Sequence, residues 1–182
     1  MNVLGVAGSP RRGGNTETIL DEVLKGAASA EAKTEKIVLA ETNVNPCKAC
    51  NECTKTRICV QKDDMASIVE KMKGADVWVL ASPVYWWGPT AQMKAFVDRW
   101  YSVRRDMFKG KRVILIVSLA DKEPSADLML KTFESIFNYL GVETYNILIK
   151  YEATSMTKAK EDKKLMKMAF ETGSDAVKTL KV

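Results

Sequence analysis

Short apolar runs alternate with amphipathic stretches along the whole chain. The apolar runs predict strands at Asn2–Gly8, Glu35–Ala40, Asp76–Ser82, Arg112–Ser118 and Val142–Lys150. The amphipathic stretches carry apolar side chains at helical spacing, which predicts helices at Thr16–Ala30, Met65–Lys73, Thr90–Val103, Pro124–Leu140 and Lys158–Leu180. Strand and helix therefore alternate five times.

This alternation predicts an α/β fold with an open, five-stranded parallel sheet and helices on both faces. Within Asp76–Ser82 (DVWVLAS) the apolar run is continuous from residue 77 to 81, as is typical of a strand covered on both sides. No linker or repeat interrupts the chain, so we expect a single domain over residues 1–182, with a polar loop at about residues 43–62. Sheets of this kind bind ligands beyond the carboxyl ends of their strands.

The loop after the first predicted strand, Gly8–Thr16 (GSPRRGGNT), has the chemistry of an anion site. It leads into a helix N-terminus, where free backbone N–H groups favour negative charge. Ser9 and Thr16 offer hydroxyl groups, and Arg11 or Arg12 can supply a charged fork. The loop has neither the Walker lysine nor the common dinucleotide spacing, which argues against a nucleoside triphosphatase. The alternative is a glycine-rich turn that only caps the helix.

A second loop, Ser82–Pro89 (SPVYWWGP), follows the buried third strand. Three aromatic residues lie between two prolines, which suits a flat heterocyclic ligand. Taken alone, Trp86 and Trp87 are equally typical of core or subunit contacts, because aromatic residues are enriched in both settings.

All four cysteines of the chain, Cys47, Cys50, Cys53 and Cys59, fall in the polar loop. Their spacing is C-x2-C-x2-C-x5-C, and such short intervals allow four thiolates to converge on one iron–sulfur centre. A zinc site remains an alternative, although structural zinc usually uses two separated pairs of ligands. Free thiols or disulfides remain a third possibility.

The chain of 182 residues contains no histidine and carries a formal charge of +5. The missing histidine excludes a Ser-His-Asp or Cys-His nucleophile, so we predict no catalytic side chain and expect a cofactor to carry the chemistry. Basic stretches such as Lys158–Lys167 are mixed with acids, so we expect neither nucleic-acid nor membrane binding. The N-terminus has no signal-peptide or membrane-span pattern, and we expect a cytoplasmic protein.

Three segments together resemble the iron–sulfur flavoprotein branch of the NADPH-dependent FMN reductase, flavodoxin-like family. They are GSPRRGGNT, CKACNECTKTRIC followed by KDDM, and ASPVYWWGPTAQMKAFVDRW. The resemblance implies strand order 2-1-3-4-5, FMN, and a [4Fe-4S] cluster on the four cysteines. It places the FMN phosphate at Ser9, Arg11, Asn15 and Thr16, and the isoalloxazine ring against Pro83, Val84, Tyr85 and Trp86. A third flavin loop is expected at Ser118–Asp121, where this chain lacks the glycine usual in relatives.

These features lead us to expect an oxidoreductase that moves electrons between a one-electron donor such as ferredoxin and an unknown acceptor. One alternative is an NAD(P)H-dependent FMN or quinone reductase without an intact cluster. A distant alternative is a zinc-stabilised module that binds nucleic acid. The resemblance also implies a homodimer or tetramer, and the stripe Phe96, Trp100, Tyr101 and Met107 either contributes to an interface or simply packs in the core.

Overall fold

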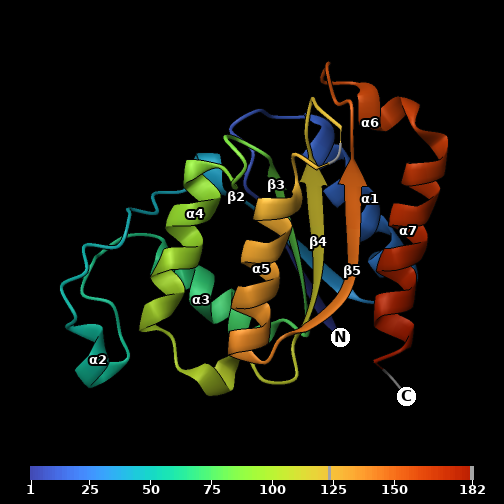
Figure 1. Ribbon diagram of the computed structural model, residues 1–182. Coiled ribbons are helices and arrows are strands. Elements are labelled where there is room, and N and C mark those ends of the chain that lie inside the picture. The colour runs from blue at the N-terminus through green and yellow to red at the C-terminus, as the bar shows by residue number, and fades with distance from the viewer. Residues whose placement is uncertain (123, 181–182) are drawn as a thin grey trace.

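The computed structural model describes residues 1–122 and 124–180 and contains a five-stranded parallel sheet (Figure 1). The strands are β1 (Asn2–Ala7), β2 (Lys33–Val38), β3 (Val77–Pro83), β4 (Arg112–Ser118) and β5 (Glu143–Lys150). Their order is β2-β1-β3-β4-β5, which confirms the predicted flavodoxin-like sheet.

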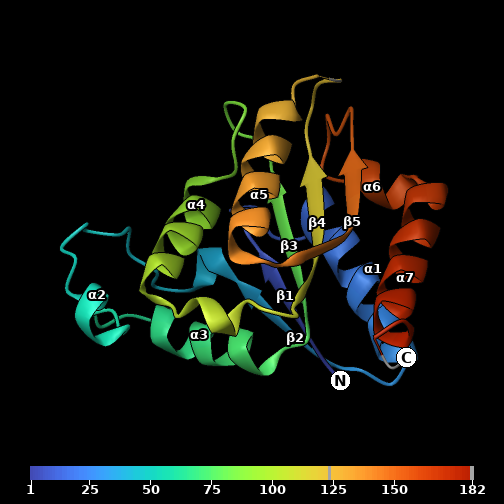
Figure 2. The same ribbon diagram turned by 60° about the horizontal axis from the view of Figure 1, so that its bottom comes forward.

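Helices cover both faces of the sheet, as Figures 1 and 2 show from two directions. One face carries α3 (Met65–Gly74), α4 (Ala91–Asp98) and α5 (Asp127–Leu140); the other carries α1 (Asn15–Ser29), α6 (Lys158–Glu161) and α7 (Lys163–Lys178). A short helix, α2 (Cys53–Thr56), lies on a loop that extends away from the sheet. Among the described residues, no helix is both long and apolar enough to cross a membrane.

The central strand β3 contributes side chains alternately to two cores. Val77, Val79 and Ala81 face the α1 and α7 side, whereas Trp78 and Leu80 face the α3, α4 and α5 side. This alternation follows from the two-residue period of a strand. Because both faces are buried, residues 77–81 are all apolar.

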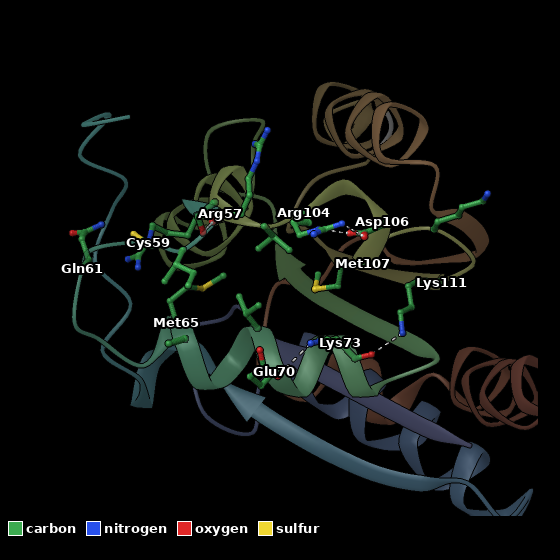
Figure 3. A pocket seen from close by; sticks show the side chains of 17 residues that line it. Arg57, Cys59, Gln61, Met65, Glu70, Lys73, Arg104, Asp106, Met107 and Lys111 are labelled. Carbon is green, nitrogen blue, oxygen red and sulfur yellow. Dashed lines mark hydrogen bonds and ion pairs between the residues drawn. The ribbon is translucent and has the colours of Figure 1, made fainter. Parts of the chain in front are cut away.

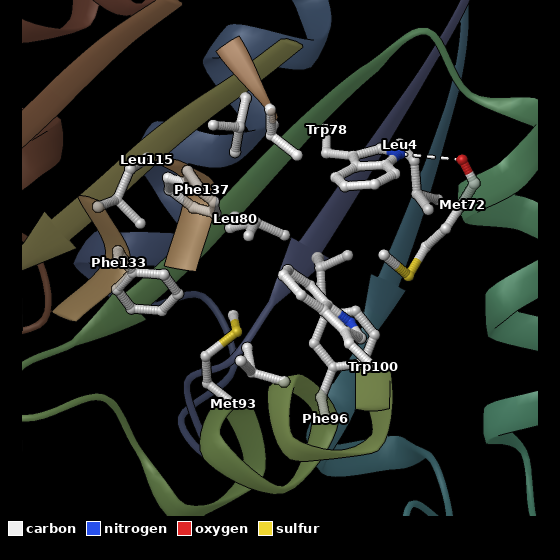
Figure 4. Close-up of a cluster of buried hydrophobic side chains, with 14 of the residues drawn as sticks. Leu4, Met72, Trp78, Leu80, Met93, Phe96, Trp100, Leu115, Phe133 and Phe137 are labelled. Atoms are coloured by element: carbon white, nitrogen blue, oxygen red, sulfur yellow. Dashed lines mark hydrogen bonds between the residues drawn. The ribbon is translucent and has the colours of Figure 1, made fainter. Parts of the chain in front are cut away.

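An aromatic cluster fills the core on the α4 side (Figure 4). The Trp78 ring lies 6.0 Å from the Trp100 ring, and its Nε1–H donates to the Met72 carbonyl at 3.0 Å. Phe96 also packs edge-on against Trp100. Phe96 and Trp100 therefore belong to the core of their own chain, whereas Tyr101 remains exposed.

Helices α1 and α7 cross at two glycines that allow close backbone contact. A side chain at Gly26 would overlap the carbonyl group of Phe170, and one at Gly173 would overlap that of Val23. Only glycine fits at both positions, because the obstructing atoms belong to the backbone. This crossing holds α1 against the sheet with its N-terminus at the strand ends.

Four predicted elements differ in their boundaries by two or more residues. The helix predicted to begin at Pro124 begins at Asp127, because residues 124–126 form a turn. The predicted single helix Lys158–Leu180 is wrong, because the chain breaks at Asp162, whose side chain accepts from the Leu165 N–H at 3.0 Å. The helix predicted to reach Val103 leaves α geometry after Asp98 and continues as a 3-10 turn, η2 (Arg99–Ser102). The second strand begins and ends two residues earlier than predicted, since Leu39–Glu41 forms another 3-10 turn.

Candidate functional site

A cavity of about 190 Å³ lies at the carboxyl ends of β1, β3 and β4, and we call it the strand-end cavity. Every predicted flavin residue except Trp86 lines it: Ser9, Arg11, Asn15, Thr16, Pro83, Val84, Tyr85 and Ser118. Ala153 and Met156, which follow β5, close the remaining side and were not predicted. Three loops distant in sequence thus converge on one site.

The loop between β1 and α1 presents an open helix N-terminus to this cavity. Gly14 stands at the N-cap position and supplies no side-chain hydrogen bond. The first N–H groups of α1 therefore have no partner within the helix and are available to an anion. Gly13 adopts φ +64°, a left-handed conformation that suits glycine and turns the chain into the helix.

The two neighbouring arginines of this loop have different environments. The Arg11 side chain lines the strand-end cavity, and within the described residues it forms no ion pair or side-chain hydrogen bond. Arg12 instead pairs with Glu17, at 3.0 Å between Nη2 and Oε1, and with Glu41. Of the two candidates left open by the sequence, Arg11 is thus the one free to meet a ligand.

Glu17 fixes the conformation of the loop between β1 and α1. Its carboxylate accepts from the Gly13 N–H at 2.7 Å, from Arg12, and from the Lys36 ammonium at 2.9 Å. Burial by itself would raise the pKa of Glu17, but the bonds from Lys36, Gly13 and Arg12 outweigh it and lower the pKa to about 2. Glu17 therefore stays ionised at neutral pH, and this role was not foreseen from the sequence.

Asn15 connects this loop to the chain that follows β5. Its Nδ2 donates to the Ser155 carbonyl at 2.6 Å, and its Oδ1 accepts from the Ala159 N–H at 2.8 Å. These bonds use one of the two N–H groups of Nδ2 and one of the two acceptor positions of Oδ1, and they tie the side chain to the segment after β5. The side chain thus positions the cavity wall.

The loop after β3 is fixed to the loop after β1 by Thr90. Its hydroxyl donates to the Gly8 carbonyl at 2.5 Å and accepts from the Met93 N–H at 3.2 Å, capping α4. The Thr90 N–H in turn donates to Ser82 Oγ at 3.1 Å. These bonds hold the two cavity loops in a fixed relative position.

Tyr85–Gly88 forms a tight turn whose two central residues are tryptophans. Tyr85 and Gly88 exchange backbone hydrogen bonds of 2.8 and 3.1 Å, and Trp86 and Trp87 have φ values of 49° and 60°. Two positive φ values define a type I′ turn, which asparagine and glycine favour and bulky residues strain. Trp86 is 90% exposed and lies outside the cavity lining, unlike the expectation from the resemblance.

The loop after β4, Ser118–Asp121, lacks the glycine that the resemblance led us to expect. It still lines the strand-end cavity. Neither Leu119 nor Ala120 adopts a positive φ in the described backbone, so this conformation does not require glycine there. The Ser118 carbonyl accepts from the Val84 N–H at 2.8 Å, and the Leu119 N–H donates to the Lys150 carbonyl at 3.0 Å. The loop is therefore joined to both neighbouring strands.

The four cysteines line a second cavity of about 310 Å³, which we call the cysteine cavity. The chain around them turns sharply, with positive φ values at Ala49, Asn51 and Arg57, and contains the short helix α2. Within residues 1–122 and 124–180, no three or more Cys, Asp or Glu side chains lie close enough to one another to hold a metal ion. The thiols thus share one cavity without converging on a point.

The chemistry of this donor set nevertheless suits a soft metal centre. Thiolates are the ligands that iron–sulfur clusters and zinc prefer, and four of them border the same space. Burial, together with the charges of Cys59, Cys50 and Cys47, raises the pKa of Cys53. The sulfur groups therefore lie close enough to influence one another electrostatically.

A buried ion pair anchors the base of the cysteine loop. Arg99 binds both oxygens of the Asp63 carboxylate, at 2.6 and 3.0 Å, and their side chains are 1% and 0% exposed. Arg99 also donates to the Asn45 carbonyl at 2.8 Å, and Asp63 accepts from the Asn45 N–H at 3.0 Å. Burial alone would raise the pKa of Asp63, but these bonds lower it to about 2.

Arg99 also connects this anchor to the cysteines. The bonds with Asp63 are the main reason that the pKa of Arg99 is raised, and the nearby Cys59 sulfur adds to the effect. Arg99 was missed by the sequence reasoning, although a charged residue between the apolar Phe96 and Trp100 of a helical stripe is an available signal.

Two acidic residues, Asp63 and Asp64, precede α3, and either is of a type that caps helix N-termini. The structure assigns this role to Asp63, whose Oδ1 accepts from the Met65 N–H at 3.2 Å. Asp64 occupies the N-cap position without a side-chain cap, and its carboxylate instead accepts from the Asn43 N–H at 2.7 Å. Both acids therefore hold the two ends of the cysteine loop together.

Comparison with known proteins agrees with this geometry. Residues 1–147 match the family described as NADPH-dependent FMN reductase. An iron–sulfur flavoprotein of Methanosarcina thermophila is 40% identical over 114 residues, which cover 63% of this chain and 60% of the relative. One from Archaeoglobus fulgidus is 33% identical over 143 residues, which cover 77% of this chain and 73% of the relative.

The solved structure of an FMN-dependent NADH-azoreductase from Bacillus anthracis superposes with a TM-score of 0.71 at 15% identity, covering 99% of each chain. At that identity it shows a shared fold. The match spans between 51% and 60% of the length of the Methanosarcina protein and two further archaeal iron–sulfur flavoproteins. The predicted family is confirmed: the chain belongs to the NADPH-dependent FMN reductase family, in the branch of the iron–sulfur flavoproteins.

Proposed function

We propose that the protein is a flavin-dependent oxidoreductase that transfers electrons between a one-electron donor such as ferredoxin and a second, unidentified redox partner. The observation that carries this proposal is the strand-end cavity, where three loops bring the predicted FMN contacts together. This is also the edge of a parallel sheet at which ligands bind in folds of this class.

The FMN phosphate would bind between the free N–H groups of α1 and the Arg11 guanidinium. Backbone N–H groups and an unpaired arginine suit a dianionic phosphate, because both donate charge-assisted hydrogen bonds. The hydroxyl groups of Ser9 and Thr16 would add neutral donors, and both residues are buried in the cavity wall. Glu17 would keep the loop in this shape.

The isoalloxazine ring would lie against Pro83, Val84 and Tyr85, which form the wall at the end of β3. When bound, FMN supplies both one-electron and two-electron chemistry. The chain has no histidine and no proposed acid or base at this site, so its residues bind and orient the flavin and restrict water.

Cys47, Cys50, Cys53 and Cys59 would hold a [4Fe-4S] cluster, as the donor chemistry of the cysteine cavity allows. Cluster assembly would draw the four thiols together from their present positions around the cavity. The exposed Lys48, Lys55 and Arg57 lie on the same loop. Their positive charge complements an acidic electron-carrier protein such as ferredoxin.

The decisive experiment is anaerobic purification followed by measurement of iron, sulfide and FMN on one sample. We expect about four iron and four sulfide per FMN. Stopped-flow mixing with reduced ferredoxin under argon should then reduce the bound centres. If reduced ferredoxin cannot reduce protein that contains both cofactors, the proposed donor is contradicted. Lys48→Glu tests the positive charge on the cysteine loop, and Lys131→Glu on α5 is its charge-matched control.

A second candidate is an NAD(P)H-dependent FMN or quinone reductase in which no cluster forms. It is favoured by the spacing of the thiols, which do not converge within the described part of the chain. Steady-state turnover with NADPH and a quinone tests it. If Cys53→Ser leaves this turnover unchanged and the wild type contains FMN without iron, the second candidate replaces the first.

We also propose that the protein assembles as a homodimer or tetramer. Large apolar side chains are exposed on several elements, including Ile58, Trp86, Tyr101 and Tyr139. Light scattering coupled to gel filtration measures this directly. A particle of 20.3 kDa, the mass of one chain, would refute it.

A further inference from the structure

A third cavity lies apart from the strand-end cavity. It measures about 930 Å³, is open to solvent, and is bordered by α3, by η2 and the 3-10 turn η3 (Arg105–Met107), and by residues 57–61 (Figure 3). It shares no lining residue with the strand-end cavity. We call it the basic cavity.

The walls of the basic cavity are apolar where they meet the core. Met65 is buried at its base, and Val69, Val103 and Met107 pack against the core cluster while still lining the space. Figure 3 shows Met65 on α3 and Met107 on the opposite side. A bound ligand would therefore need an apolar body to use this surface.

The rim is charged and predominantly positive. Its basic residues are Arg57, Lys73, Arg104, Lys109 and Lys111, and its acidic residues are Glu70 and Asp106. Arg99 also borders the cavity, but Asp63 neutralises it. Five bases against two acids leave an excess of three positive charges.

Most of this excess is not compensated within the described chain. Arg57 and Lys109 form no ion pair or side-chain hydrogen bond there, and the Lys111 ammonium donates only to the carbonyls of Lys73 and Ala75. The acids bind their neighbours, since Arg104 pairs with Asp106 at 2.8 Å and Lys73 with Glu70 at 3.9 Å. Lysine and arginine charges without acidic partners favour an anionic ligand.

We propose that the basic cavity binds a small molecule with an anionic group, such as a carboxylate, sulfonate or phosphate, on an apolar body. Its volume falls within the roughly 300–1,000 Å³ typical of small-molecule sites. The ligand's charge would lie at the basic rim, and its apolar part against Val69, Val103 and Met107. This inference does not depend on FMN, because no element of the strand-end cavity takes part.

The position of the cavity places this ligand beside the cysteines. Cys59, Gln61, Arg99 and Ser102 line both the basic cavity and the cysteine cavity. They form a shared wall between the two. A ligand in the basic cavity would therefore contact the same residues that border the thiols.

Anilinonaphthalene sulfonate is a suitable probe, because it joins a sulfonate to an apolar aromatic body and fluoresces when its surroundings are apolar. The full chain, purified with its cofactors and saturated with FMN, is titrated with this dye. We expect one saturable site per chain. The uncharged phenylnaphthylamine should bind at least about tenfold more weakly, because it lacks the anionic group.

Charge reversal separates this site from nonspecific dye binding. Lys109→Glu and Arg57→Glu should each weaken sulfonate binding by about fivefold or more at low salt, with much less effect on phenylnaphthylamine. Lys131→Glu is the matched control, since Lys131 is exposed on α5 and does not line the basic cavity. Met107→Gln should weaken both dyes, because it removes apolar wall.

Three results would overturn the proposal. In the first, Lys109→Glu and Lys131→Glu affect the dye equally. In the second, FMN displaces the dye competitively, which assigns it to the strand-end cavity. In the third, the basic cavity belongs to a protein contact. This is the case if the dye binds only after dilution separates subunits, or if an acidic peptide binds while the dye does not.

Discussion

The loop after β1 and the cysteine loop are each anchored by a buried carboxylate that accepts several hydrogen bonds. Glu17 binds the Gly13 N–H, Arg12 and Lys36; Asp63 binds the Met65 and Asn45 N–H groups and Arg99. The pKa is lowered to about 2 in both cases. The two carboxylates thus have similar chemical environments, but the two loops that they hold differ in how firmly they are fixed.

The loop after β1 is held on several sides, whereas the cysteine loop is held only at its base. Thr90 and Asn15 join the first loop to the chain after β3 and after β5. The cysteines are exposed or half-buried on a segment that extends beyond the sheet. Contacts at the base thus orient a loop without fixing its functional groups, and the four thiols depend on what they bind to bring them together.

Among the changes that test this difference between the two loops, removal of the Asp63 carboxylate should have the largest effect. Asp63→Ala leaves the buried Arg99 guanidinium without its partner, and loss of one member of a buried ion pair destabilises a fold by about 3–5 kcal/mol. Urea unfolding at matched cofactor content measures this loss. Asp64→Ala is the control and should cost about 1 kcal/mol, because its bond to Asn43 is exposed. Equal losses in the two variants would show that the ion pair does not anchor the loop.

The second-largest effect should come from acid, which protonates the Glu17 carboxylate and removes its contribution to stability. Because the pKa of Glu17 falls from an ordinary 4.5 to about 2, its ionised form stabilises the fold above pH 4.5, and that contribution disappears as the pH falls toward 2. The shift corresponds to about 3 kcal/mol. Glu17→Gln should therefore unfold with a weaker pH dependence between pH 4.5 and 2. An unchanged acid limb in urea titrations at several pH values would argue against the ionised anchor.

A change at Arg11 should reduce cofactor affinity rather than stability. Arg11→Ala removes the one loop arginine that faces the strand-end cavity, so FMN should bind about 10- to 100-fold more weakly, as for loss of a charge-assisted hydrogen bond. Flavin fluorescence titration gives the dissociation constant. Arg12→Ala is the counterpart, and it should lower stability through Glu17 with a smaller effect on FMN. If Arg12→Ala weakened FMN binding more than Arg11→Ala, Arg12 and not Arg11 would be the arginine that contacts the cofactor.

The smallest expected effect is a gain in stability at the aromatic turn. Replacing Trp86 by Asn and Trp87 by Gly supplies the residues that a type I′ turn favours, which should stabilise the fold by about 1 kcal/mol. The urea midpoint should rise, and FMN affinity should change by less than about threefold, a 0.7 kcal/mol difference. A larger loss of affinity would instead support Trp86 as a flavin contact.

The sequence predicted the sheet and its strand-end site because both depend on local patterns. Continuous apolar runs identify buried strands, and loops such as GSPRRGGNT have a chemistry that is readable without neighbours. The strand order came from the family resemblance, and the observed order agrees with it. Topology then brings Ser9, Tyr85 and Ser118 to one edge without further information.

Contacts between distant segments were not predictable in the same way. The pairing of Arg99 with Asp63 joins residues 36 positions apart, and the bonds of Asn15 reach residues more than 100 positions away. Nothing in the local pattern specifies such partners. The break at Asp162 was missed for the same reason, since Lys150 on β5 holds its carboxylate at 2.9 Å.

The four tryptophans form two contrasting pairs. Trp78 and Trp100 are buried in the core, whereas Trp86 and Trp87, in the turn that follows Tyr85 of the strand-end cavity, are 90% and 53% exposed. A water-soluble quencher such as acrylamide would therefore reach the emission of the turn pair and spare that of the core pair. The protein thus contains two built-in optical reporters, one of global unfolding and one of changes at the Tyr85–Gly88 turn.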